Sequence, residues 1–155
     1  MSLRVYVETS VVSYLTSFPS RDILVATHQQ LTHVWWTSRT RFELFVSEAV
    51  LAEASSGDPA AAERRMAAVA SLPILQITHE VEDLARHFLV AGALPPKAFV
   101  DALHVAAAAV HRMDFLLTWN CAHIANAQIR GKLEALCRNR AHQPPMICTP
   151  QELLA

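Results

Sequence analysis

Short apolar runs alternate with helical segments along the chain, and this alternation constrains the fold more than any other feature of the sequence. The runs, each shorter than an ordinary helix, lie at 3–7, 42–46, 73–77, 115–118 and 146–148. Amphipathic or Ala-rich helical patterns fill the stretches between them. Strands joined by helical crossovers form parallel sheets that are covered on both faces. The sequence therefore predicts an α/β fold, a three-layer sandwich with a central parallel sheet of about five strands flanked by helices.

Chain length and charge limit the organisation and the partners of such a fold. A chain of 155 residues is the size of one ordinary domain, so we expect a single domain over 1–155. A hydrophobic content of 52% with only 3 glycines argues against disorder. The net charge of −1 excludes a nucleic-acid binder that works by bulk positive charge. Any polyanionic partner must be held locally.

Cysteine usage and hydropathy bear on the compartment. The three cysteines are odd in number and show no C-x-x-C spacing, which fits neither a disulfide framework nor a zinc knuckle. No apolar run reaches the length of a membrane span, and the N-terminus lacks the pattern of a signal peptide. We expect a cytoplasmic protein with no membrane partner.

Glycine placement excludes the common nucleotide-binding motifs. The glycines lie only at 57, 92 and 131, so neither G-x-G-x-x-G nor the P-loop pattern is present. This disfavours a binder of small-molecule nucleotides.

Polar residues follow several of the predicted strands, where ligands of open parallel sheets collect. Glu8 directly follows the first run, Glu53 lies in a short helix after the second, and Asn120 lies just beyond the run 115–118. Each also has a structural interpretation: Glu8 as a helix-capping carboxylate, Glu53 as a solvated charge, and Asn120 as the cap of a helix over 123–137. Thr9 or Ser10 is the predicted cap of the first helix.

Asp101 is the most informative carboxylate, because it lies in a helix over 97–111 that is otherwise apolar on nearly every side. An unpaired carboxylate in such surroundings costs on the order of several kcal/mol, so Asp101 needs a cation or a hydrogen-bond donor. The predicted topology brings it to the same sheet edge as Glu8, Glu53 and Asn120. Oxygen ligands of this kind suit Mg²⁺ or Mn²⁺.

The sequence around these residues resembles the PIN domain family of VapC-type toxin ribonucleases. The resemblance runs from Leu3 to about Cys148, and its order and spacing are more specific than any one motif. It is carried by VYVETSVVSYL at 5–15, SEAVLAE at 47–53, DALHVAAA at 101–108 and LLTWN at 116–120. It implies a parallel sheet with an acidic pocket that binds Mg²⁺ or Mn²⁺ and cleaves RNA.

The resemblance also assigns roles to residues. The four catalytic places fall on Glu8, Glu53, Asp101 and Asn120. Glu8 and Asp101 would hold the metal, and Glu53 or Asn120 would position the attacking water. The neighbouring hydroxyls that orient ligands or water would be those of Thr9, Ser10 and Thr118.

Two departures from the family pattern affect the expected site. Glu8 stands where Asp is common and adds about 1.5 Å of reach. Asn120 stands where an acid is frequent, which leaves three carboxylates. We therefore expect one tightly held ion, with any second ion arriving with the substrate.

Basic residues around the predicted site have less specific interpretations. His104 lies one turn after Asp101, and we interpret it as a core histidine bonded to a backbone carbonyl rather than as half of a His/Asp metal pair. Arginines that can hold flanking phosphates, or that are plain surface charges, are Arg39, Arg41, Arg130 and Arg138.

These observations give one leading hypothesis and one rival from another class. The leading hypothesis is a metal-dependent endoribonuclease, the toxin of a type II toxin–antitoxin pair, with an RNA substrate, an antitoxin partner and a homodimeric state. The rival is a catalytically silent PIN-like module that binds RNA or protein.

Overall fold

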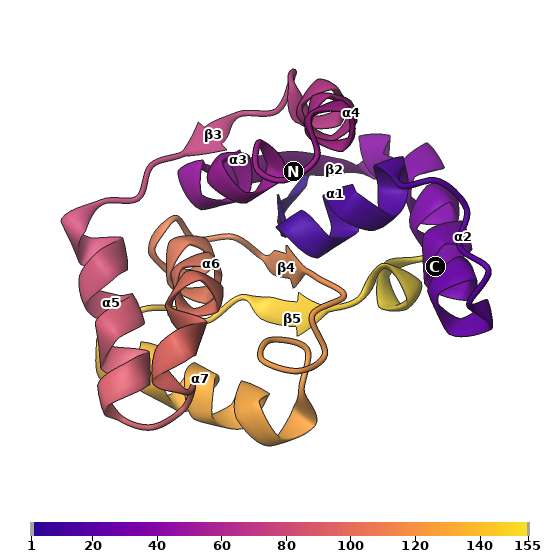
Figure 1. The fold of residues 1–155 in the computed structure, drawn as a ribbon. Coiled ribbons are helices and arrows are strands. Elements are labelled where there is room, and N and C mark those ends of the chain that lie inside the picture. Colours follow the sequence, from indigo (N-terminus) through magenta and orange to yellow (C-terminus); the bar gives the residue numbers. More distant parts are fainter. Residues whose placement is uncertain (1, 155) are drawn as a thin grey trace.

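A computed structural model describes residues 2–154 and contains a five-stranded sheet in the order β3-β2-β1-β4-β5 (Figure 1). All neighbouring strands are parallel, with Leu3 opposite Phe42 and Val5 opposite Phe115. The predicted fold class is confirmed. The strands are β1 Leu3–Val7, β2 Phe42–Ser47, β3 Ile74–Leu75, β4 Phe115–Leu117 and β5 Met146–Cys148.

Helices cover both faces of this sheet. From β1 the chain moves to β2 and β3 on one side, and it then returns past β1 to β4 and β5. Right-handed crossovers in opposite directions place their helices on opposite faces. Figure 1 shows α1 to α4 gathered on one side of the molecule and α5 to α7 on the other. The helices are α1 Thr9–Thr16, α2 Ile23–Thr37, α3 Glu48–Ala54, α4 Pro59–Val69, α5 His79–Val90, α6 Phe99–Val110 and α7 Ala127–Asn139.

The core lies on both sides of β1 and β4. Tyr6 and its neighbours Val5 and Val7 in β1 are fully buried, as are Leu116 and Leu117 in β4. Central parallel strands covered on both faces have this continuous apolar character. Helix α6 packs closely because it is rich in small residues. Its fully or almost fully buried alanines are Ala102, Ala106, Ala107, Ala108 and Ala109.

Two predicted helix starts are wrong, and both errors concern caps. Helix α1 begins at Thr9 and is capped by the Glu8 carboxylate, not by Thr9 or Ser10. Helix α7 begins at Ala127 instead of 123, because the side chain of Asn126 caps it by accepting from the backbone N–H of Gln128.

Residues 120–125 form turns instead of the start of that last helix. The Asn120 carbonyl accepts from the backbone N–H groups of Ile124 and Ala125, and its side chain accepts from His123 N. Asn120 therefore caps a turn. Within residues 2–154, no helix has the length and apolar character needed to cross a membrane.

Candidate active site

The carboxyl ends of β1 and β4 meet where the direction of strand order reverses. Backbone hydrogen bonding continues past both strands, because Glu8 N donates to Leu117 O at 3.0 Å and Thr118 N donates to Cys148 O at 3.0 Å. Glu8 and Thr118 thus lie next to each other at the topological switch point. In open α/β sheets, ligands bind in the crevice at this point.

Glu8 is almost completely buried, with 4% of its surface exposed, and three donors bind its carboxylate. Its Oε1 accepts from the hydroxyls of Ser10 (2.6 Å) and Thr118 (2.5 Å). Its Oε2 accepts from the backbone N–H of Ser10 at 3.0 Å. A buried carboxylate needs such donors, and here two of the three predicted hydroxyls provide them. Glu8 is therefore both a helix cap and a charged group at the sheet edge.

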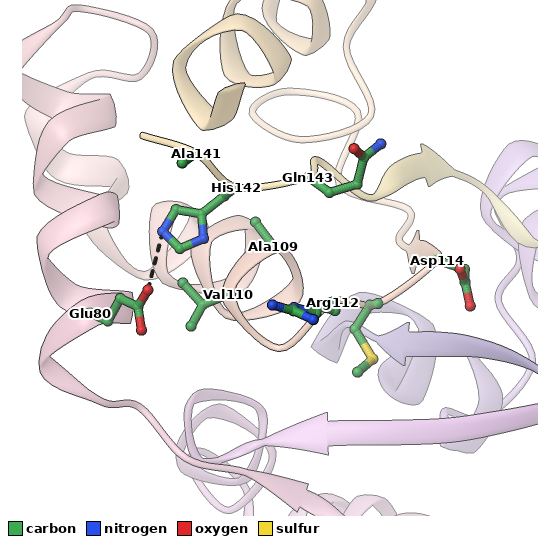
Figure 2. A pocket seen from close by; sticks show the side chains of 9 residues that line it. Glu80, Ala109, Val110, Arg112, Asp114, Ala141, His142 and Gln143 are labelled. Atoms are coloured by element: carbon green, nitrogen blue, oxygen red, sulfur yellow. Dashed lines mark ion pairs between the residues drawn. The ribbon is translucent and has the colours of Figure 1, made fainter. Parts of the chain in front are cut away.

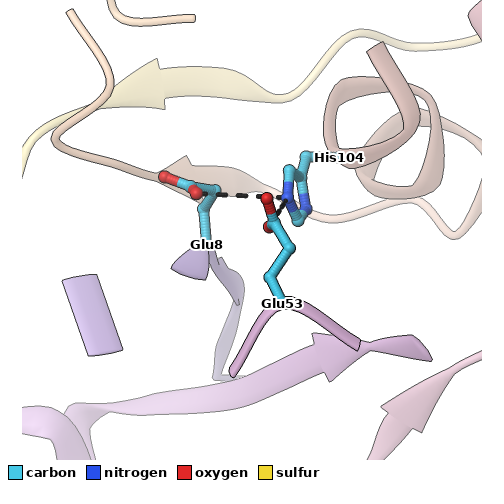
Figure 3. Close-up of side chains that lie close together, drawn as sticks. All are labelled: Glu8, Glu53 and His104. Carbon is cyan, nitrogen blue, oxygen red and sulfur yellow. Dashed lines mark hydrogen bonds and ion pairs between the residues drawn. The ribbon is translucent and has the colours of Figure 1, made fainter. Parts of the chain in front are cut away.

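Glu53 reaches the same edge from the last turns of α3. The hydroxyl of Thr9 donates to Glu53 Oε1 at 2.6 Å, and Nε2 of His104 lies 2.6 Å from the same oxygen. His104 Nε2 is also 4.0 Å from Glu8 Oε2. Figure 3 shows the imidazole of His104 facing both carboxylates. The two glutamates, from different elements, thus converge on one histidine.

The other side of the His104 ring is held from the sheet. Its Nδ1 lies 2.6 Å from the hydroxyl of Tyr6, and that hydroxyl lies 2.6 Å from Ser47 Oγ. Ser47 caps α3, accepting from the backbone N–H groups of Ala49 and Val50. His104 is fully buried, as predicted for a core histidine, but both ring nitrogens contact side chains. The backbone-carbonyl partner predicted for His104 is therefore wrong.

Glu53 and His104 stabilise each other's charged forms. Burial opposes the ionised form of Glu53, but the hydrogen bond and charge of His104, with the Thr9 hydrogen bond, outweigh it and lower the pKa of the carboxyl. Burial likewise opposes the imidazolium of His104. The bond to Glu53 and the charges of Glu8, Glu53 and Asp101 outweigh it and raise the pKa of His104. His104 and Glu53 therefore favour an ion pair.

Tyr6 remains a neutral hydroxyl next to that pair. Burial, with the charges of Glu8 and Glu53, raises the pKa of Tyr6 far above its ordinary range, although the Ser47 hydrogen bond opposes this. Its single proton can go to His104 Nδ1 or to Ser47 Oγ, since either oxygen of the Tyr6–Ser47 contact can be the donor.

Asp101 lies in the first turn of α6, one turn before His104. Its side chain is 21% exposed, so it lies at the border of the core and not within it. The Asn120 amide donates to Oδ1 at 3.1 Å, and His123 Nδ1 lies 2.8 Å from Oδ2. The helix dipole also favours a carboxylate in a first turn. The donors that the sequence demands for Asp101 are thus Asn120 and His123.

Hydrogen bonds, together with the ion-pair contact between His104 and Glu8, join these groups into one network. Asn120 contacts Asp101 through its side chain and Thr118 through its backbone N–H, which donates to Oγ1 at 2.9 Å. Thr118 in turn donates to Glu8. The network contains every residue that was predicted for the site, and their catalytic roles remain predictions. The residues that sequence reasoning missed as members are Tyr6, Ser47, His104 and His123.

Weak sequence signals did exist for two of these four residues. Tyr6 places a hydroxyl between two valines in an otherwise apolar stretch. His104 follows Asp101 by three residues on the same helix, so the two share a helix face. The predicted arginines contribute less. Arg39 and Arg41 precede β2 and so lie at the opposite edge of the sheet.

A divalent cation fits the chemistry of this cluster. Ligand atoms of Glu8, Glu53 and His104 all lie within 4.8 Å of one another. Glu53 Oε2 accepts no hydrogen bond within residues 2–154, and each bonded carboxylate oxygen can accept more than one partner. Two carboxylates match the charge of such an ion. The predicted metal pair Glu8 and Asp101 differs from this compact cluster, and Asp101 joins it through Asn120 and Thr118.

A hollow of the molecule lies away from this cluster. Figure 2 shows it beside the ion pair of Glu80 and His142, whose Oε1 and Nε2 are 3.4 Å apart, and its volume is about 580 Å³. Arg112 and Asp114 line it just before β4 begins. It therefore lies toward the amino ends of the strands, away from the acidic network.

Comparisons with known proteins identify the fold. No family model and no curated protein matches the sequence. Among solved structures, the chain is similar to VapC20 of Mycobacterium tuberculosis, a toxin that cleaves the sarcin–ricin loop, with a TM-score of 0.60 and 20% identity over 77% of this chain and 92% of that chain. It is also similar to VapBC2 from Rickettsia felis, solved with a DNA fragment of its promoter, with a TM-score of 0.62 and 13% identity over 95% and 98% of the two chains. The chain thus has the PIN-like fold of VapC toxins.

Proposed function

We propose that this protein is a metal-dependent endoribonuclease that hydrolyses phosphodiester bonds of RNA. The observation that carries this proposal is the convergence of three carboxylates, from the end of β1, from α3 and from α6, on one network at the carboxyl edge of the sheet. The PIN-like fold supports the reaction class. The net charge of −1 is compatible with it, because an ion held by carboxylates can bind phosphate locally.

The chain's own residues have separable tasks in this proposal. A bound Mg²⁺ or Mn²⁺ would polarise a phosphoryl oxygen and acidify water. Glu8 and Asp101 would hold the ion, with Ser10 and Thr118 fixing the Glu8 carboxylate. Glu53, the more exposed glutamate of the cluster, would contact the ion through one carboxylate oxygen and orient the attacking water through the other.

Both polar atoms of the Asn120 side chain form hydrogen bonds within the protein. Its amide donates to Asp101 and its oxygen accepts from His123 N, so it positions Asp101 within the network. This supports a positioning role for Asn120 in place of the water-binding role that the family resemblance allows.

Cleavage of single-stranded RNA by the purified protein in Mn²⁺ tests the proposal. We expect Asp101→Asn to lose at least about a hundredfold in rate, because it removes a charge from the site and keeps the shape. The matched control is Asp83→Asn, which changes an exposed carboxylate on α5 and should cleave like the wild type. Equal cleavage by wild type and Asp101→Asn would contradict the site. RNA retained but never cleaved would support the silent binding module instead.

We also propose that the protein is a toxin restrained by an antitoxin, and that it forms a homodimer. The likeness to VapC20 and to the VapBC2 assembly supports the antitoxin partner. Expression of the chain alone should stop growth of a bacterial host, while Asp101→Asn should not. Light scattering of the purified protein tests the dimer, and a monomer mass would contradict it.

A further inference from the structure

We infer that His104 supplies a nitrogen ligand to the divalent ion of this site, so that the site favours Mn²⁺, or a similar first-row transition ion, over Mg²⁺. The inference rests on the proposed metal dependence and deepens it. Neither the family resemblance nor the sequence interpretation gives His104 this role.

The spacing of the ligand atoms supports the inference. Ligands about 2.1 Å from an octahedral ion lie about 3 Å apart when adjacent and about 4.2 Å apart when opposite. His104 Nε2 lies 2.6 Å from Glu53 Oε1 and 4.0 Å from Glu8 Oε2. A small outward movement of Glu53, whose side chain is 38% exposed, is enough to admit an ion between them.

The contacts of Nδ1, on the other side of the His104 ring, support the ligand role independently. Metal-binding histidines usually donate their other ring N–H to a fixed partner, which sets the tautomer and the ring orientation. Nδ1 of His104 has that partner in Tyr6, whose hydroxyl is held by Ser47. An ion that binds Nε2 displaces the proton that His104 shares with Glu53. With Nδ1 donating to Tyr6 and Tyr6 donating to Ser47, the lone pair of Nε2 then faces the ion. All three residues are buried and therefore well fixed.

Ligand chemistry then selects the class of ion. Oxygen-only sites suit Mg²⁺, whereas imidazole is a better ligand for transition ions. The compact cluster of two carboxylates and one imidazole has the mixed character that favours the latter.

Pulsed electron paramagnetic resonance of the Mn²⁺-loaded full chain tests the inference directly. We expect nitrogen coupling from a directly bound imidazole in the wild type, and we expect labelling of histidine with ¹⁵N to change it. This comparison needs no variant, so it does not depend on the folding of a mutant. The coupling should vanish in His104→Gln and persist in His123→Gln, which alters the other histidine beside the carboxylates.

Affinity gives a second measurement. Calorimetric titration should show Mn²⁺ binding weakened about ten- to a hundredfold in Tyr6→Phe, which removes the group that orients His104. Mg²⁺ binding should be weaker than Mn²⁺ binding in the wild type, and His104→Gln should lose that preference.

The outcomes separate this inference from the proposed function. Bound Mn²⁺ without nitrogen coupling, no Mn²⁺ binding, or coupling that disappears only in His123→Gln would each overturn the ligand role of His104. Mn²⁺-dependent RNA cleavage without nitrogen coupling would leave the nuclease proposal intact. Nitrogen coupling with no cleavage of RNA would support the ligand role and count against the nuclease.

Discussion

Among single residues, Tyr6 links the hydrophobic core to the acidic network. Its ring is fully buried in β1, while its hydroxyl lies 2.6 Å from both Ser47 Oγ and His104 Nδ1. A buried hydroxyl with two partners contributes to stability mainly because its removal leaves those partners unsatisfied.

Tyr6→Phe should therefore destabilise the protein by about 1–3 kcal/mol. Urea denaturation followed by circular dichroism measures this. Tyr14→Phe is the matched control, because the Tyr14 hydroxyl has no hydrogen-bond partner within residues 2–154, and we expect a change within about 0.5 kcal/mol. Equal effects of the two substitutions would contradict the structural role of the Tyr6 hydroxyl.

The His104–Glu53 pair makes stability depend on pH. The pKa of His104 is raised above 6.5 in the folded chain, so its contribution is complete below pH 6.5 and is lost as pH rises through the folded value. The pKa of Glu53 is lowered below 4.5, so its contribution is complete above pH 4.5 and is lost as pH falls through the folded value. The pair therefore stabilises the fold most fully between these two limits.

We expect the difference in unfolding free energy between wild type and His104→Gln to be largest between pH 4.5 and 6.5 and to shrink at higher pH. Denaturation in EDTA from pH 5 to 9 measures this without metal. His33→Gln, at an exposed position of α2, should follow the wild-type pH profile. A difference that stays constant with pH would count against the ion pair.

Among elements, the short helix α3 places Glu53 and is fixed at its start by Ser47. The Ser47 hydroxyl caps α3 and contacts Tyr6 as well, so one side chain sets both the helix and the orientation of His104. Helix α4 begins with a similar cap, in which Asp58 accepts from the backbone N–H of Ala61 at 2.9 Å, but its cap makes no contact with the network.

Ser47→Ala and Asp58→Ala should each cost about 0.5–2 kcal/mol, because each removes a helix cap. Only Ser47→Ala should also slow RNA cleavage, since it disturbs the residues that hold His104 and Glu53. Rates at a temperature where both variants are fully folded separate the two effects. A similar loss of cleavage in Asp58→Ala would show that stability alone controls the rate.

For the whole molecule, strand order decides where chemistry is possible. The order β3-β2-β1-β4-β5 puts the reversal between β1 and β4, and the acidic network lies at that reversal. A hollow of about 580 Å³ lies at the other end of the sheet. The hollow and the acidic network thus lie at opposite ends of the sheet. The carboxylates indicate the functional site, because concentrated negative charge attracts a cation.

A divalent ion that binds only the folded protein should stabilise it. At a Mn²⁺ concentration a hundred times the dissociation constant, linkage gives about 2.7 kcal/mol, or a rise in Tm of about 5–10 °C for a chain of this size. Glu8→Gln should lose this rise, while Glu63→Gln, an exposed change on α4, should keep it. Differential scanning fluorimetry with and without Mn²⁺ is the measurement. An unchanged rise in Glu8→Gln would place the ion elsewhere.

Local sequence signals predicted the layout of the fold and part of the site. The caps at Ser47, Asp58 and Thr78 are local features, because a cap is a hydrogen bond between near neighbours in sequence. The strands β4 and β5 were readable because buried parallel strands are continuous apolar runs, and β1 was readable from its alternating, β-branched pattern. Glu8 was readable as a site residue because it directly follows such a strand.

Tertiary structure alone decided which side chains meet. His104 contacts Tyr6 and Glu53, which are 98 and 51 residues away in sequence, and Asp101 contacts His123, which is 22 residues away. Such contacts depend on how α3 and α6 are rotated and packed against the sheet, and no local periodicity specifies that rotation. The sequence by itself therefore determined the α/β architecture and the sheet edge that carries the acids. Packing decided that a buried histidine lies between two of those acids.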